Sequence, residues 1–514
     1  MARINTNIPS MIAQAHLRST NAELGLRLER LSTGLRINRG SDDPAGLITS
    51  ERIRSDLEGV RQALRNAERS SNVIATTEAS LAEVNDLLNS IRALIVEAAN
   101  TGANSEDERN ANQLQIDSAI DSITRISNTA TFGGLKLLNG SLDYTMSGLA
   151  PSAIDHARIT HASFVGNTAI QVDVDVIASA QTGNLFYNGG TTPPGEVLST
   201  ITLEIAGPKG VQVLTFASGI PLSDVANAIN KLSSATGLKA ELINGNVNSG
   251  VVFSSVDYGS AAFVSVKRLN PPNDPSDDAW ILHKFNDGVP MPDYSGGFPW
   301  TDVITATRDI GQDVSALVNG IVGTGNGLRV KLSTQTLGVD LLLDADFATD
   351  PASSSSTFYV TGGGAMFQVG PEVSIQQQIN IGIPSVAASN LGATLIDGTL
   401  AFLSSLKSGG ENSITASMAR NDFTGANQVI AAAIDETSVL RGRLGAFERN
   451  VVQTNVRSMQ AAFENLSASS SAIRDADFAL ETSQLNRAQI LASAGATVLT
   501  IANQQAQQVL QLLG

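Results

Sequence analysis

The stretch "GSDDPAGL", residues Gly40 to Leu47, holds two adjacent carboxylates between glycines. Neighbouring carboxylates can bind a divalent cation, and glycine-rich loops can hold phosphate groups. The same residues also suit the start of a helix. Asp43 is a good N-cap, Pro44 suits the first helical position, and Asp42 would lie near the positive end of the helix dipole. These preferences favour a helix start over a metal site, and Gly40 and Gly46 permit a close backbone approach there.

The other residues that could do chemistry form no catalytic or metal-binding pattern. None of the four histidines, His16, His156, His161 and His283, belongs to a His-Glu-x-x-His motif. His156 and His161 are five residues apart, which suits neither one helix face nor one strand face. The chain has no cysteine, so thiolate ligands and disulfides are excluded. We therefore predict surface or packing histidines, no metal, no cofactor and no enzymatic activity.

Two further segments are rich in glycine, "GTGNGL" at 323–328 and "GGGAMFQVG" at 362–370. Neither joins a strand to a helix in the way that dinucleotide and P-loop sites require. Both are predicted to be turns.

Charge and hydropathy exclude several classes of partner. The net charge of −16 argues against nucleic acid, which favours a basic surface. The N-terminus lacks the apolar core and cleavage site of a Sec signal peptide, and no apolar run is suited to membrane insertion. The last residues, from Ala488 to Gly514, carry no charge but contain Gln and Asn throughout, which predicts an amphipathic helix.

Composition divides the chain into helical flanks and a strand-rich centre. Fourteen of the 16 prolines lie between Pro151 and Pro384, whereas the flanks are almost free of proline. Long helices are permitted in the flanks but not in the centre. The predicted fold class is α+β, with long N- and C-terminal helices paired like a coiled coil and a β-rich insertion of two subdomains.

Apolar residues in both flanks recur at threes, fours and sevens, which predicts helices longer than those of ordinary globular domains. In the C-terminal flank the pattern shifts by one position after Val451. A narrow apolar stripe needs a partner helix, and the simplest solution pairs the two flanks. The residues predicted to form this packing seam are Ile53, Leu57, Val60, Leu64, Leu88, Ile91, Leu94, Ile95, Leu444, Phe447 and Val451.

The centre alternates apolar and polar residues over short runs, which predicts strands, for example "STITLEIAG" and "VQVLTFASG". The segment "PLSDVANAINKL" predicts a helix with Ser223 as its N-cap. A proline-rich stretch at 270–278 is predicted to be a loop or linker between the two subdomains.

Both flanks resemble bacterial flagellins. The N-terminal resemblance lies in "RLERLSTGLRINRGSDDPAGLITSERIRSDLEG" and "ATFGGLKLLNG", and the C-terminal one in "RDADFALETSQLNRAQILASAGATVLTIANQQAQQVLQLLG". It covers roughly residues 1–140 and 420–514, and a weaker match around "PLSDVANAIN" resembles an insertion found in long flagellins. The resemblance implies a structural subunit that polymerises into the helical filament used for swimming, after unfolded export by the flagellar type III apparatus.

The resemblance also implies a division into five parts. Residues 1–40 and 471–514 would be inner-tube helices, residues 41–140 with the spoke and 406–470 would form the outer shell, and 141–405 would face the solvent. The implied spoke contains Asp42, Asp43, Pro44 and Gly46. The implied inner-tube contacts are Leu24, Leu28, Leu31, Ile490, Leu491, Val498 and Leu499.

Implied partners are further copies of the chain, the flagellar cap and hook-associated proteins, and an export chaperone at the C-terminus. In some flagellins a Toll-like receptor recognises the region that corresponds to 87–100. The receptor motif has an arginine where this chain has Ser90, keeps the leucine at Leu94, and has a glutamate at or near Gln115; Arg92 matches another family arginine. We therefore expect weak receptor activation and a packing role for Leu94 against a neighbouring subunit.

Three alternatives stay open at this point. A hook–filament junction protein has related ends and a stretch like "SDDP", although the C-terminal match favours flagellin. A peptidase inserted in the centre lacks its motif. An adhesive or carbohydrate-binding insertion could use Trp280 and Trp300 for stacking, but burial in a core explains two tryptophans more simply.

Overall fold

The computed structural model describes residues 6–511, apart from 165–167, 191–193, 271–279, 286–297, 351–354 and 397. Long helices at both ends of the sequence flank a β-rich centre, which confirms the predicted α+β class. The predicted linker at 270–278 lies outside the described residues except for Asn270. The chain forms two compact units: the first comprises Met1–Ser70, Gln368–Gln377 and Arg449–Gly514, and the second comprises Ser71–Phe367 and Gln378–Glu448.

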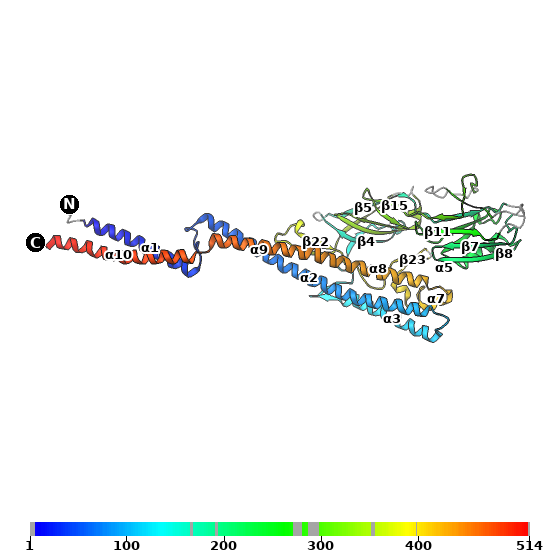
Figure 1. Ribbon diagram of the computed structural model, residues 1–514, viewed down its shortest axis with the longest axis horizontal. Coiled ribbons are helices and arrows are strands. Elements are labelled where there is room, and N and C mark those ends of the chain that lie inside the picture. Colours follow the sequence, from blue (N-terminus) through cyan, green and yellow to red (C-terminus); the bar gives the residue numbers. More distant parts are fainter. Residues whose placement is uncertain are drawn as a thin grey trace. The chain divides into compact units, whose positions relative to one another are not determined.

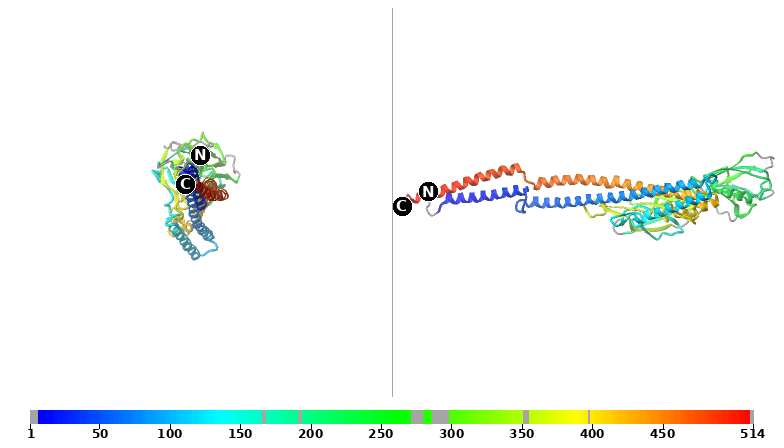
Figure 2. Two further views of the ribbon diagram at one scale, coloured as in Figure 1. Left: turned by 90° about the vertical axis from the view of Figure 1, so that its left-hand side faces the viewer. Right: turned by 90° about the horizontal axis from the view of Figure 1, so that it is seen from below.

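The first unit is built on two antiparallel helices, α1 (Ile8–Thr33) and α10 (Phe478–Gln511), which lie side by side in Figures 1 and 2. The Asn7 side chain caps α1 by accepting a hydrogen bond from the Ser10 amide at 3.1 Å. Gly34 ends α1 with a φ of 72°, a left-handed conformation that glycine adopts without steric cost. The start of α2 (Pro44–Ala98) and α9 (Gln453–Arg474) complete this unit.

A π turn at Glu448–Val452 joins α8 (Thr424–Phe447) to α9. It lies where the sequence pattern shifts by one position. A π turn holds one more residue than an α turn, which accounts for a one-residue shift in the apolar pattern. Leu444 before the turn, and Val452 and Met459 in and after it, are buried.

The helices of the second unit are the remainder of α2, α3 (Glu106–Thr129), α7 (Ile414–Arg420) and α8. Ser105 and Glu108 form a capping box at the start of α3, in which each side chain bonds the backbone N–H of the other. Ile116, Ile120 and Ile123 recur on one face of α3 and are buried. This face covers part of the helical core.

The first β lobe is two facing sheets around one core, which includes Val174, Val330 and Phe358. One sheet has the strand order β16-β15-β5-β20-β3 and the other has the order β17-β18-β19-β4. The strands are β3 (Tyr144–Ser147), β4 (Ile154–Ala162), β5 (Ile170–Ala178), β15 (Ser315–Val318), β16 (Ile321–Val322), β17 (Thr324–Asn326), β18 (Arg329–Ser333), β19 (Leu337–Leu343) and β20 (Ser356–Gly363).

The second lobe has its own core, which includes Leu203, Phe253 and Trp280. Its sheets have the orders β13-β12-β6-β10-β9 and β14-β11-β7-β8, and α4 (Leu222–Asn230) packs on the same core. The strands are β6 (Asn184–Tyr187), β7 (Ile201–Gly207), β8 (Gly210–Phe216), β9 (Leu238–Leu242), β10 (Val251–Ser255), β11 (Phe263–Arg268), β12 (Leu282–Lys284), β13 (Ile304–Thr305) and β14 (Arg308–Ile310).

Three details of the centre differ from the sequence prediction. The second lobe is nested inside the first, and the chain crosses between them at 178–184 and 310–315, where Gln181 pairs with Gln312. Ser223 is not an N-cap, because α4 already begins at Leu222. The glycine-rich segments contain strands, β17 and β21 (Ala365–Gln368), because tertiary pairing with neighbouring strands overrides their local turn preference.

Candidate assembly interface

The connection between α1 and α2 is held by backbone bonds to the C-terminal flank. After Gly34 the chain leaves α1, and the Arg36 amide donates to the Arg474 carbonyl at 2.7 Å. The Ala476 amide donates in turn to the Gly34 carbonyl at 2.9 Å. Ile37 is fully buried below this crossing. The N-terminal and C-terminal flanks therefore change direction at the same place.

Asp42 and Asp43 bind backbone amides at this connection. Asp42 Oδ2 accepts from the amides of Asn38 and Arg39, and these bonds hold the pKa of the Asp42 carboxyl below its usual value. Asp43 Oδ1 accepts from the Gly46 amide at 2.9 Å, directly before α2 begins at Pro44. A Cβ atom on Gly46 would lie 2.7 Å from Ile37 Cδ1, so the helix start also depends on glycine.

Helices α1 and α10 bury few of their own side chains. In α1 the buried residues are Ser10 and Ala13, and in the described part of α10 Glu481, Ala488 and Ala502 have less than a tenth of their surface exposed. Large apolar side chains instead face the solvent. They are Ile8, Met11, Ile12, Leu28, Phe478, Leu480, Ile490, Leu491, Val498 and Ile501. Such a concentration of exposed apolar groups marks an interaction surface.

The predicted inner-tube residues lie on this helix pair. Leu28, Ile490, Leu491 and Val498 are exposed in the single chain. Leu24, Leu31 and Leu499 are half-buried. The exposed side chains are free to contact further copies, whereas the half-buried ones already cover part of the helix pair.

The predicted packing seam divides into two groups. Val60, Leu88, Ile91, Ile95 and Leu444 are buried, so within one chain they belong to the core of the subunit itself. The half-buried members retain surface for other contacts, and they are Ile53, Leu57, Leu64, Leu94, Phe447 and Val451.

The residues of the implied receptor region lie on α2 and α3, which run side by side in Figures 1 and 2. Ser90, Arg92 and Gln115 are exposed, and Leu94 is half-buried. Val96 and Leu114 are also strongly exposed, which adds apolar surface to the same helices.

The ion cluster between the terminal helices was not predicted from the sequence. Arg27 and Arg30 of α1 both contact Glu481 of α10, with N–O distances of 3.0 and 3.2 Å. One signal for it was available: Glu481 is the last acidic residue of the chain, and the two arginines are one helical turn apart. Residue spacing alone could not show that Glu481 of α10 lies opposite these arginines of α1.

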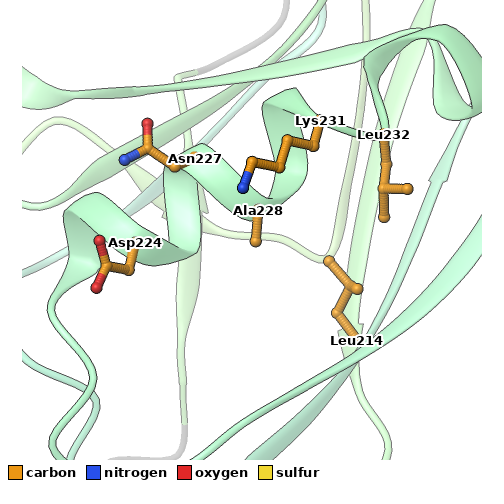
Figure 3. A pocket seen from close by; sticks show the side chains of 6 residues that line it. All are labelled: Leu214, Asp224, Asn227, Ala228, Lys231 and Leu232. Carbon is orange, nitrogen blue, oxygen red and sulfur yellow. The ribbon is translucent and has the colours of Figure 1, made fainter.

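The remaining candidates for chemistry have structural contacts. His161 Nε2 lies 2.6 Å from the Thr334 carbonyl oxygen, and His283 packs edge-on against Trp300. A hollow between β8 and α4 is lined by Leu214, Asp224, Asn227, Ala228, Lys231 and Leu232 (Figure 3). Its lining contains neither a histidine nor a hydroxyl nucleophile. Among the described residues, no three His, Asp or Glu side chains are grouped to hold a metal.

His156 gives the second unit a pH dependence. Burial lowers the pKa of His156 to about 4 from 6.5, and nearby Arg158 and Arg329 act in the same direction. Between these values the unfolded chain binds more protons than the folded one, so stability falls as the pH drops from 6.5 to about 4. We expect a loss of up to about 3 kcal/mol, measured by denaturant unfolding at several pH values.

Replacing His156 with Gln should flatten this slope, because glutamine does not titrate. The exposed His16 on α1 provides the matched control, and its replacement with Gln should leave the slope unchanged. An unchanged slope in the His156 variant would assign the pH dependence to other groups.

No helix in the described ranges combines the length and apolarity needed to cross a bilayer. Ten of the 28 exposed large apolar side chains among the described residues lie on two helices from opposite ends of the sequence, and each β lobe has a core of its own. This exposed apolar surface on a helix pair is typical of proteins that associate with other chains.

Comparison with known proteins identifies the family. Residues 4–143 match the bacterial flagellin N-terminal helical region, and residues 427–513 match the bacterial flagellin C-terminal helical region. The chain is 30% identical to the flagellin of Escherichia coli K12 over 99% of both chains. It is 29% identical to the flagellin of Salmonella muenchen, also over 99% of both. The chain belongs to the bacterial flagellin family and is a structural subunit of the extracellular flagellar filament, not an enzyme.

Solved structures of other flagellar proteins are more distant. The flagellar cap protein FliD of Escherichia coli has 16% identity and a TM-score of 0.26, covering 65% of this chain and 96% of that one. The flagellar hook associated protein-3 of Legionella pneumophila has 11% identity and a TM-score of 0.24, covering 90% and 99%. The family assignment rests on the flagellins.

Proposed function

We propose that this chain polymerises without another subunit type into the long helical filament used for swimming. The observation that carries the proposal is the exposed apolar surface of α1 and α10. Each fully buried Leu, Ile or Phe side chain is worth about 1.5–3 kcal/mol, so covering this surface with further copies would drive assembly strongly. The net charge of −16 opposes association of the chains, which makes assembly dependent on salt.

In this filament the five predicted parts take different positions. Residues 1–40 and 471–514 form the inner tube, and 41–140 and 406–470 form the outer shell. Residues 141–405 face the solvent. Two features support this arrangement: the terminal helices need further apolar contacts, and the two β lobes are each closed around their own core.

We also assign export and partner binding to the chain ends. The chain leaves the cell unfolded through the flagellar type III apparatus, assembles below the cap and follows the hook-associated proteins. The absence of cysteine supports threading, since no disulfide can form during passage. The exposed apolar side chains of α10 need cover before assembly, which supports an export chaperone at the C-terminus. The Toll-like receptor interaction stays weak, because Ser90 and Gln115 replace charged residues of the receptor motif.

Seeded polymerisation tests the proposal. Purified chain is added to short fragments of its own filament, and the products are examined by electron microscopy. We expect helical tubes that lengthen in proportion to the added chain. A hook–filament junction protein would instead add a short layer at the fragment ends and stop. Growth that stops in this way would replace the filament assignment with the junction assignment.

A further inference from the structure

Glu481 is the most completely enclosed carboxylate of the terminal helix pair. Its side chain is 5% exposed, and those of Arg27 and Arg30 are 16% and 17% exposed. Arg27 Nη1 donates to both carboxylate oxygens, and Arg30 Nη1 donates to Oε1. These charge-assisted hydrogen bonds are strongly directional, because the planar guanidinium group donates its N–H bonds in a fixed geometry.

Apart from the backbone bonds of Gly34 and Arg36 to Ala476 and Arg474 at the edge of the pair, the buried contacts between α1 and α10 select one register only weakly. The remaining buried residues of the helix pair, Ser10, Ala13, Ala488 and Ala502, are small. Small side chains at repeated spacings fit one another after a shift along the helix. The polar bonds at the far end, from Asn7 Nδ2 to the Ala502 carbonyl and from Ser10 Oγ to Asn503, lie close to the end of the pair, where helices fray.

If α10 moved along α1 by one heptad, Glu481 would no longer lie opposite Arg27 and Arg30. Because the helices are antiparallel, the shift would place either Ala488 or Arg474 opposite the two arginines in place of Glu481. Both arrangements take the Glu481 carboxylate away from the two guanidinium groups, and Arg27 would keep only its longer contact with Glu23, at 3.5 Å. The Nε atoms of Arg27 and Arg30 are already buried without a hydrogen-bond partner in the described structure, so the cluster depends on Glu481. Buried charges without a partner strongly disfavour such shifted pairings.

We propose that Glu481 is a positioning residue that sets the register of α1 against α10. A single register aligns the exposed apolar side chains of the two helices into one repeating assembly surface. Polar residues buried in helix pairs fix register at other sites by the same physics, since only one alignment satisfies them. This inference deepens the proposed function and rests on it.

Disulfide trapping measures the register directly, because the natural chain has no cysteine. The pair Ser10→Cys with Asn503→Cys reports the observed register, since these side chains are 2.8 Å apart. The pairs Ser10→Cys with Ala496→Cys and Leu17→Cys with Asn503→Cys report shifts of one heptad in either direction. Assembled filaments are oxidised, and intramolecular links are identified by peptide mass.

In the otherwise natural chain we expect the pair reporting the observed register to link at least about tenfold more than either shifted pair. Glu481→Gln should lose this preference and raise the critical concentration for assembly about tenfold or more. Glu29→Gln is the matched control, because Glu29 pairs with Arg39, whose side chain is 70% exposed. It should leave both measurements unchanged.

A triple variant separates register from simple destabilisation. Arg27→Gln, Arg30→Gln and Glu481→Gln together leave no buried charge, so the helices can pair without that penalty. We expect links in the observed and the shifted registers at comparable yields. A triple variant that links only in the observed register would overturn the proposal, as would Glu481→Gln filaments with the natural pattern. Failure of the natural chain itself to form filaments would instead contradict the proposed function.

Discussion

Removal of residues 480–514 is expected to abolish filament growth while the second unit keeps its fold. The truncation deletes nearly all of α10 and with it the partner of α1. A lone helix such as α1 is marginal in water, because most helix stability in proteins comes from tertiary packing. The second unit, Ser71–Phe367 with Gln378–Glu448, makes its compact contacts without the deleted residues.

Two measurements check this expectation. Sedimentation with electron microscopy should detect no filaments at concentrations where the full chain assembles completely. Denaturant unfolding followed by far-ultraviolet circular dichroism should retain the transition of the second unit at an unchanged midpoint. The full-length chain, unfolded and refolded in the same way, is the control. Tubes formed by the truncated chain would show that α10 is dispensable and that assembly uses another surface.

Replacing Glu436 with Leu is expected to destabilise the second unit by about 3–5 kcal/mol. Arg158 Nη2 on β4 lies 2.6 Å from Glu436 Oε1 on α8, and their side chains are 19% and 10% exposed. Glu436 Oε2 also accepts from the Gly392 amide at 2.9 Å. The substitution leaves a largely buried guanidinium and a backbone N–H without their acceptor.

The charges around this pair increase the effect. Arg443 is close by and donates to the Gly382 carbonyl at 2.6 Å. Burial raises the pKa of the Asp143 carboxyl, despite the opposing influence of Arg158 and Arg443. Removing Glu436 therefore takes negative charge from a region with two arginines. The first lobe should consequently lose part of its attachment to α8.

Urea unfolding of single and double variants tests this attachment. Arg158→Met combined with Glu436→Leu should recover most of the lost stability, because neither charge stays buried. Glu241→Gln is the matched surface control: Glu241 pairs with Lys239 in a half-exposed ion pair, and its loss should cost below about 1 kcal/mol. Equal stability of the single variant and the natural chain would show that water already satisfies Arg158.

Much of the helical fold was predictable because helix periodicity is a local property. The apolar repeats and the proline-free flanks predicted long helices, and α2 spans Pro44–Ala98 without a break. The shift after Val451 marked the position of the π turn. Several strands of the centre were predicted too, since alternation over five to seven residues is equally local. The α+β class followed from these two periodicities.

The errors occurred where distant segments decide the local structure. The glycines of segments 323–328 and 362–370 predicted turns, yet pairing with other strands extends residues 324–326 and 365–368. Ser223 has the chemistry of an N-cap, but α4 begins before it, with Pro221 in the capping position. The nesting of one lobe inside the other depends on crossings between residues more than a hundred positions apart, such as Gln181 and Gln312.

Residues 40–47 show which features the sequence determines and which the tertiary structure determines. By itself the sequence determined that Asp43 and Pro44 favour a helix start, because capping depends on residues within one turn. It also determined which apolar residues recur at the two ends. Only the tertiary structure decided which of these side chains are buried in the subunit and which stay exposed in the single chain. It alone placed Glu481 against Arg27 and Arg30, because that contact depends on the register of two helices from opposite ends of the chain.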